Sequence, residues 1–223
     1  MSALGYYLRS SVIKKQVMGV TGLMLCGFLI SHLLGNTLIF VGSDAFNKYA
    51  HALITNPLIY GAEAILASVF LTHIGLAIKL TIENKAARPQ GYYLRQTTGR
   101  GATFASSTMP YTGMIILVFL IRHLIDFKFG PVYTTMVHGV EMRDMYRTVI
   151  EFFASPLNVA WYVFVMIVLG LHVSHGFWSA FQSIGINHPK YNGLIRFTSK
   201  LFAVVVTIGY SSLAIYCHLQ GAN

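Results

Sequence analysis

Histidines inside long apolar runs are the residues of this sequence whose types and spacing could do chemistry. In the first run, Thr21-Gly22 is followed by His32, eleven residues after the threonine. In the third run, Thr112-Gly113 is followed by His123 at the same offset. The repeated offset predicts that these two imidazoles lie at one depth on two helices that run in the same direction.

A second pair of histidines repeats a different offset. Pro57 precedes His73 by sixteen residues, and Pro156 precedes His172 by sixteen. These helices should run opposite to the first two, so this pair shares a second depth. From a rise of about 1.5 Å per residue and a core of about 30 Å, the two levels should be roughly 15 Å apart.

Two histidines at one depth on different helices are what bis-imidazole ligation of a haem requires. The sequence therefore predicts two haem b groups, with iron ligands His32 and His123 at the outer level and His73 and His172 at the inner level. Glycines would allow a macrocycle to approach the backbone; they are Gly22, Gly75, Gly113 and Gly170. The alternative is that the histidines are helix–helix hydrogen-bond partners. A zinc site is not expected, because zinc needs three or four ligands close together.

Two further residues are candidates for the haem sites. His175 lies one turn from His172 and is the rival ligand or a donor beside it, although the repeated offset favours His172. Arg122 lies within the third run, where an arginine is costly unless it is paired. It could bind a haem propionate, reach another helix or extend to the headgroups.

The elements that must position these residues are transmembrane helices. The 223 residues are 55% hydrophobic and 10% charged, against roughly 25% charged in soluble domains. The sequence predicts an all-α polytopic membrane protein with one domain over residues 1–223. Five runs are long enough to span a bilayer: 17–41, 58–82, 110–129, 157–184 and 194–218. We expect Pro57, Pro110 and Pro156 to mark helix starts. The first run is too long for the apolar part of a signal peptide.

Basic residues indicate the orientation. The N-terminal segment and the second and fourth links, with their helix ends, hold eleven Lys and Arg residues, and the opposite side holds four. The predicted N-terminus is therefore cytoplasmic. This distribution in short loops, rather than in one patch, also argues against nucleic-acid binding. The segment 142–153 has the pattern of an amphipathic helix, and the basic link 85–100 is a candidate docking surface or ordinary positive-inside charge.

These residues resemble a known family, the cytochrome b membrane anchors of the succinate:quinone oxidoreductases (succinate dehydrogenase and fumarate reductase). The likeness is to the class with one five-helix chain and two b haems. It is carried by TGLMLCGFLISH (21–32), FLTHIGLA (70–77), TGMIILVFLIRH (112–123) and LHVSHGFWSAFQSIG (171–185). The family's fourth ligand precedes a glycine by four residues, and Gly176 here again selects His172. Arg147 resembles a family arginine near the outer haem.

The resemblance implies an electron-transfer role at a bacterial cytoplasmic membrane, linked to the tricarboxylic acid cycle. A flavoprotein subunit carrying FAD and an iron–sulfur subunit would dock on the cytoplasmic face, and the complex could form a higher oligomer. Electrons would pass between that subunit and a quinone, with menaquinone expected by analogy, through the inner and outer haems. Two family features are missing: Gly170 stands where some relatives have a glutamate, and neither Asp44 nor Glu63 matches the acid near their outer quinone site.

Two other classes of function compete with this interpretation. One is a cytochrome b subunit of another membrane oxidoreductase, such as a hydrogenase or formate dehydrogenase. The other is a transporter whose histidines relay protons. Transporters often have helices broken near mid-membrane, whereas the prolines here mark helix starts.

Overall fold

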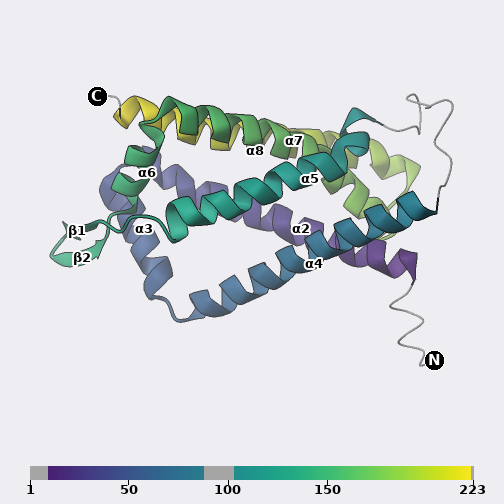
Figure 1. Cartoon of the computed structure of the whole chain (residues 1–223), viewed down its shortest axis with the longest axis horizontal. Coiled ribbons are helices and arrows are strands. Elements are labelled where there is room, and N and C mark those ends of the chain that lie inside the picture. The colour runs from purple at the N-terminus through teal and green to yellow at the C-terminus, as the bar shows by residue number, and fades with distance from the viewer. Residues whose placement is uncertain (1–9, 88–102, 222–223) are drawn as a thin grey trace. The chain divides into compact units, whose positions relative to one another are not determined.

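In a computed structural model, which describes residues 10–87 and 103–221, five helices are long and apolar enough to cross a membrane. They are α2 (Ser11–Asn36), α4 (Leu58–Ala86), α5 (Phe104–His123), α7 (Pro156–Ser183) and α8 (Pro189–Gly221), as Figure 1 shows. Many of their large apolar side chains, such as Leu71, Ile121 and Leu157, are exposed on the protein surface. In water such a surface would be unfavourable, and in lipid it is the expected one. The chain is an all-α, multi-pass membrane protein.

The helix bounds differ from the expected ones mainly at their beginnings. Helix α5 begins at Phe104, so Pro110 lies inside it rather than at its start, and that prediction was wrong. Proline lacks a backbone N–H, so Pro110 cannot donate to the carbonyl of Ser106, four residues earlier. Membrane helices tolerate such an interior proline. Pro156 is the first residue of α7, as predicted.

Two of the long helices end in tighter or wider turns. The 3₁₀ segment η1 (Thr37–Phe40) continues α2. The π segment η2 (Leu124–Lys128) continues α5, and the amide of Phe129 bonds the carbonyl of Leu124, five residues earlier. Single π turns inside helices are rare and occur frequently at functional sites.

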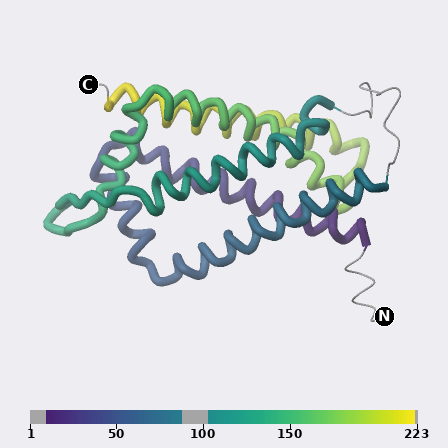
Figure 2. Tube along the Cα trace, viewed as in Figure 1, coloured from purple at the N-terminus to yellow at the C-terminus, as the bar shows by residue number. Residues whose placement is uncertain are grey.

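The chain divides into two compact units, and each long helix contributes to both. Unit 1 comprises the described residues within 1–27, 65–114 and 171–203. Unit 2 comprises residues 28–64, 115–170 and 204–221. The link 184–188 belongs to unit 1, and the links 41–57 and 129–155 belong to unit 2. The Cα trace in Figure 2 follows each helix through the chain.

Unit 2 contains three short elements that the expected links did not include. Helix α3 (Ser43–Thr55) lies in the first link, and strands β1 (Thr134–Val137) and β2 (Val140–Arg143) form an antiparallel hairpin in the third. Helix α6 (Met145–Phe153) is the amphipathic helix expected at 142–153, shortened at its start because Met142 and Arg143 belong to β2. Helix α3 contacts both α6 and β2, so the first and third links share one side, as the orientation argument requires.

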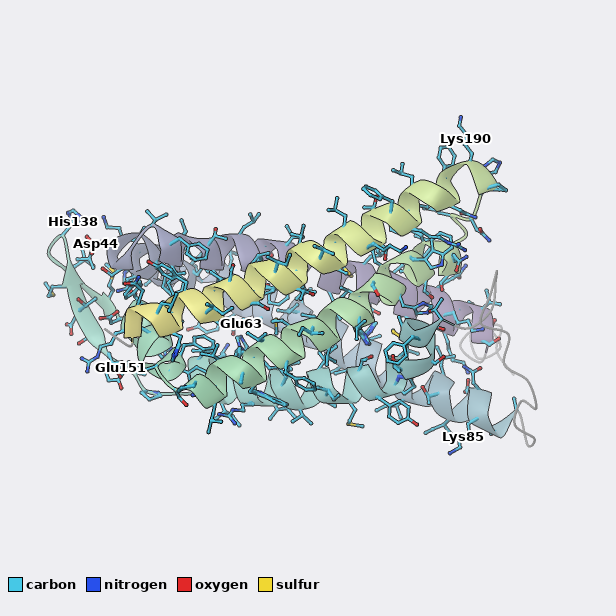
Figure 3. The ribbon with its side chains drawn as sticks, turned by 90° about the horizontal axis from the view of Figure 1, so that it is seen from above. Asp44, Glu63, Lys85, His138, Glu151 and Lys190 are labelled. Atoms are coloured by element: carbon cyan, nitrogen blue, oxygen red, sulfur yellow. The ribbon has the colours of Figure 1, made fainter. Side chains whose placement is uncertain are left out.

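The buried side-chain amide of Asn47 links α3 to the start of α6 in unit 2. Asn47 is 1% exposed, donates to the Asp144 carboxylate and accepts from the amide of Tyr146. Asp144 also caps α6 by accepting from the amide of Arg147. Figure 3 shows His138 and Asp44 beside each other at the hairpin, and the two residues form an ion pair when the imidazole is protonated.

Candidate histidine sites

The outer candidate ligands lie together in unit 2. The ring centroids of His32 in α2 and His123 in α5 are 5.9 Å apart, and the ring planes are inclined at 87°. A metal–imidazole bond is about 2 Å long, and an imidazole centre lies roughly 1 Å beyond its bonding nitrogen, so two imidazoles on opposite sides of one metal have centres about 6 Å apart. The spacing therefore suits two imidazoles that would hold one metal ion between them.

Aromatic rings surround this outer pair. Phe28 stacks on His32 and Phe119 stacks on His123, each from the preceding turn of the same helix. Tyr210 of α8 lies 6.0 Å from His32 between ring centroids. These contacts restrict the imidazole rotamers, and they give the site the apolar walls that a haem pocket needs.

One ring nitrogen of His123 has a polar partner that the sequence did not predict. The Tyr162 hydroxyl lies 3.4 Å from His123 Nδ1 and donates to Asp126, at 3.3 Å. Since that hydroxyl has a single hydrogen, its remaining role towards His123 is to accept from Nδ1–H. This tautomer leaves Nε2 free to bind a metal, and the partner resembles those that orient metal-binding histidines in proteins.

Asp126 also binds Arg122. The Arg122 guanidinium donates to Asp126 at 3.3 Å and to Asn158 at 3.1 Å. Of the three roles weighed for Arg122, the structure therefore shows contact with another helix, α7. Asp126 could have been singled out from the sequence, because it is an acid inside the third apolar run, and such acids are functional candidates. Tyr162 carries no comparable sequence signal.

Arg147 lies in α6, and both of its contacts belong to unit 2. Its Nε donates to Glu151 at 2.6 Å, and its guanidinium lies 4.2 Å from the centre of the Tyr133 ring. The Tyr133 hydroxyl also hydrogen-bonds Glu151, and these two hydrogen bonds hold the pKa of the Glu151 carboxyl below its ordinary value. Glu63 forms an ion pair with Lys128.

The inner candidate ligands lie in unit 1, and each one rests on a Thr-Gly pair of another helix. His73 Nδ1 is 3.2 Å from the Thr21 hydroxyl, and His172 Nδ1 is 3.0 Å from the Thr112 hydroxyl. The repeated sequence motif therefore makes repeated contacts. The Thr-Gly pair of α2 contacts a histidine of α4, and the Thr-Gly pair of α5 contacts a histidine of α7.

The glycine of each Thr-Gly pair accommodates the imidazole itself. A Cβ atom at Gly22 would lie 3.3 Å from His73 Cε1, and one at Gly113 would lie 3.5 Å from His172 Cε1. We expected these glycines to make room for a macrocycle. In the structure the atoms beside them are histidine carbons, so close packing of helix against ring explains the glycines. His175 lies on the next turn of α7 and contacts neither Thr112 nor Gly113 among the interactions of the described residues.

Ion pairing and close packing hold the helices of unit 1 in this arrangement. Lys14 of α2 is 8% exposed and bonds Glu83 of α4 at 2.6 Å. Gly19 of α2 packs on Ala180 of α7, where an added Cβ would lie 3.2 Å from a backbone oxygen. Ser199 of α8 donates to the carbonyl of Ser174. Four basic residues counted for the orientation, Arg9, Arg88, Arg95 and Arg100, lie outside the described residues, as does most of the candidate docking link 85–100.

The histidines are paired rather than clustered. Over residues 10–87 and 103–221, no group of three or more His, Cys, Asp or Glu side chains is arranged to hold a metal ion. A site that supplies two imidazoles and apolar walls suits a metal whose remaining ligands come from a macrocycle.

Comparison with known proteins gives one informative similarity. No family model matches the chain, and no solved structure matches it. A curated protein of Bacillus subtilis (strain 168), the succinate dehydrogenase cytochrome b558 subunit, is 28% identical over 165 residues, which are 71% of this chain and 72% of that protein. The chain is therefore a multi-pass membrane protein that is distantly related, over most of its length, to a succinate dehydrogenase cytochrome b subunit.

Proposed function

We propose that this chain is a dihaem cytochrome b, the membrane anchor of a succinate dehydrogenase or fumarate reductase complex in a bacterial cytoplasmic membrane. The observation that carries the proposal is the outer pair of histidines, whose ring centroids are 5.9 Å apart. The two inner histidines support it, because each contacts a Thr-Gly pair of another helix in the same way. The similarity to a succinate dehydrogenase cytochrome b subunit supports the kind of complex.

In this proposal His32 and His123 hold the outer haem, and His73 and His172 hold the inner one. When bound, the two haems supply one-electron carriers between an iron–sulfur subunit on the cytoplasmic side and a membrane quinone, by analogy menaquinone. The chain's own part is to fix imidazole tautomers, exclude water and set the polarity around each site. His172 is preferred to His175 as the ligand because Thr112 orients its ring.

Arg122 and Arg147 are the proposed cationic partners for the propionates of the outer haem. Each one already has a carboxylate partner, Asp126 and Glu151 respectively. A propionate would therefore share the guanidinium with that carboxylate, which the five donors of an arginine permit.

Haem counting tests the ligand assignment. We expect the purified complex to contain two haems b per chain by a pyridine haemochrome assay. Each of the four substitutions His32→Ala, His123→Ala, His73→Ala and His172→Ala should remove one of them. The control substitution His138→Ala, at the tip of the hairpin, should leave both.

The inner ligand needs its own comparison. His175→Ala should retain both haems, whereas His172→Ala should not. A loss of haem on changing His175 alone would refute the choice of His172. A purified wild-type chain without haem would refute the cytochrome proposal itself. If the chain instead contains haem but no flavoprotein or iron–sulfur protein purifies with it, only the assignment to a succinate dehydrogenase or fumarate reductase complex would be refuted.

A further inference from the structure

The hydroxyls of Thr21 and Thr112 face the ring nitrogens that the proposed haem iron would not use. Each hydroxyl also bonds carbonyls of its own helix: Thr21 with Val17 and Met18, at 2.9 and 3.0 Å, and Thr112 with Thr108 and Met109, at 3.2 and 3.1 Å. A threonine hydroxyl has one hydrogen, and these carbonyls can only accept it. When that hydrogen is on a carbonyl, the lone pairs of the oxygen are left for the imidazole, which then donates from Nδ1–H.

This direction of donation fixes the tautomer of both inner rings. Nδ1 carries the proton of each ring, and Nε2 is left with a free lone pair. Metal-binding histidines commonly donate their second ring N–H in this way, which orients the ring and raises the basicity of the ligand.

We propose that Thr21 and Thr112 are a matched pair of positioning residues, which hold His73 and His172 in the Nδ1–H tautomer and lower the potential of the inner haem. The proposal rests on the dihaem function above. It assigns a role to the threonine of each Thr-Gly motif. The hydroxyl of that threonine hydrogen-bonds the histidine of another helix, whereas the sequence motif indicated only the spacing to the histidine eleven residues later on its own helix.

The inner and outer histidine sites differ in the charge of the groups that hydrogen-bond the imidazoles. Within the described residues, the hydrogen-bond partners of the inner imidazoles are threonine hydroxyls. Behind His123 the tyrosine hydroxyl leads to the Asp126 carboxylate. Loss of a threonine hydroxyl should therefore change only the inner haem, because the outer one has a separate support.

A redox titration of the purified complex tests the proposal, read from the haem absorbance bands. Thr21→Val keeps the shape of the side chain and removes the acceptor, so the imidazole becomes a poorer electron donor and the ferrous state is favoured. We expect the ferric–ferrous equilibrium of one haem to shift by up to about tenfold, which raises its midpoint potential by about 59 mV for a one-electron couple. Thr112→Val should shift the same haem in the same direction.

Conservative and matched variants separate the hydroxyl from packing. Thr21→Ser and Thr112→Ser should retain the wild-type potential. Thr108→Val is the control, since its hydroxyl bonds only carbonyls of its own helix, those of Phe104 and Ala105. If a valine variant loses the inner haem, retention by the matching serine variant would still identify the hydroxyl as the cause.

Three results would overturn the proposal while leaving the cytochrome intact. The first is an unchanged potential of both haems in the valine variants. The second is loss of haem in valine and serine variants alike. The third is an equal shift produced by Thr108→Val.

Discussion

Removal of the Tyr162 hydroxyl should destabilise the protein by an amount that can be estimated from its contacts. Tyr162 is 6% exposed, and its hydroxyl contacts both His123 Nδ1 and the Asp126 carboxylate. Tyr162→Phe leaves the imidazole N–H without its acceptor, and leaving such a buried group unsatisfied costs about 1–3 kcal/mol. Asp126 keeps Arg122 as a partner, so the expected loss is at the lower end of that range.

The ring of Tyr162 should contribute more than its hydroxyl. It forms edge-to-face contacts with Phe119, Phe153 and Phe152, at centroid distances of 4.9, 4.9 and 5.4 Å. Tyr162→Ala removes these contacts and leaves a cavity, for which losses of about 3–5 kcal/mol are typical of large aromatic residues. The two variants should therefore differ by about 2 kcal/mol or more in the free energy of unfolding.

Thermal unfolding of the detergent-solubilised complex, followed through the haem absorbance, measures both effects. Tyr162→Phe should retain two haems with a modestly lowered midpoint temperature, and Tyr162→Ala should lose the outer haem. Tyr111→Phe, on the exposed face of α5, is the matched control. Equal behaviour of the phenylalanine and alanine variants would refute the reasoning, because the ring contacts would then contribute nothing.

Three further predictions concern close packing, a buried charge and pH. Gly22→Ala should displace His73 and reduce inner haem content several-fold in the haemochrome assay, whereas Gly61→Ala in α4, where an added Cβ has no heavy atom within 4 Å, should not. Lys14→Met should lower the thermal midpoint of the solubilised complex, because Glu83 loses its buried partner; an unchanged midpoint would mean that the pair is not stabilising. The Glu151 carboxyl has a lowered pKa, so its stabilising contacts are present above the ordinary pKa near 4.5 and are lost as pH falls through the lowered value. The difference in midpoint temperature between wild type and Glu151→Gln should accordingly disappear in that acid range.

The long helices could be predicted because lipid imposes a simple rule on the sequence. Apolar runs of sufficient length gave all five spans, and the equal offsets to His32 and His123 correctly placed these imidazoles beside each other. The start of α5 was missed because a proline was taken to begin a helix. The helix instead begins six residues earlier, at Phe104, and continues through Pro110, as membrane helices can.

The supports of the histidines could not be predicted in the same way. The contact between Thr21 and His73 depends on which helices are neighbours, and the sequence of one helix does not contain that information. The hairpin did have a local signal: two short alternating segments separated by His138-Gly139, both of which have positive φ, as a two-residue hairpin turn requires. The amphipathic pattern of the helix that follows is the stronger signal in this segment.

The π turn at the end of α5 has a consequence for comparing this chain with its relatives. A π turn contains one residue more than an α turn, as an insertion of a single residue into the helix would produce. A relative without that residue would have an unbroken α-helix here, and the positions after the deletion would be rotated by about 100°. The acid that meets Tyr162 would then face elsewhere, and Lys128 would lose its register with Glu63. The length of this short segment, which an alignment treats as a simple gap, therefore indicates whether a chain can place a carboxylate behind its outer histidine.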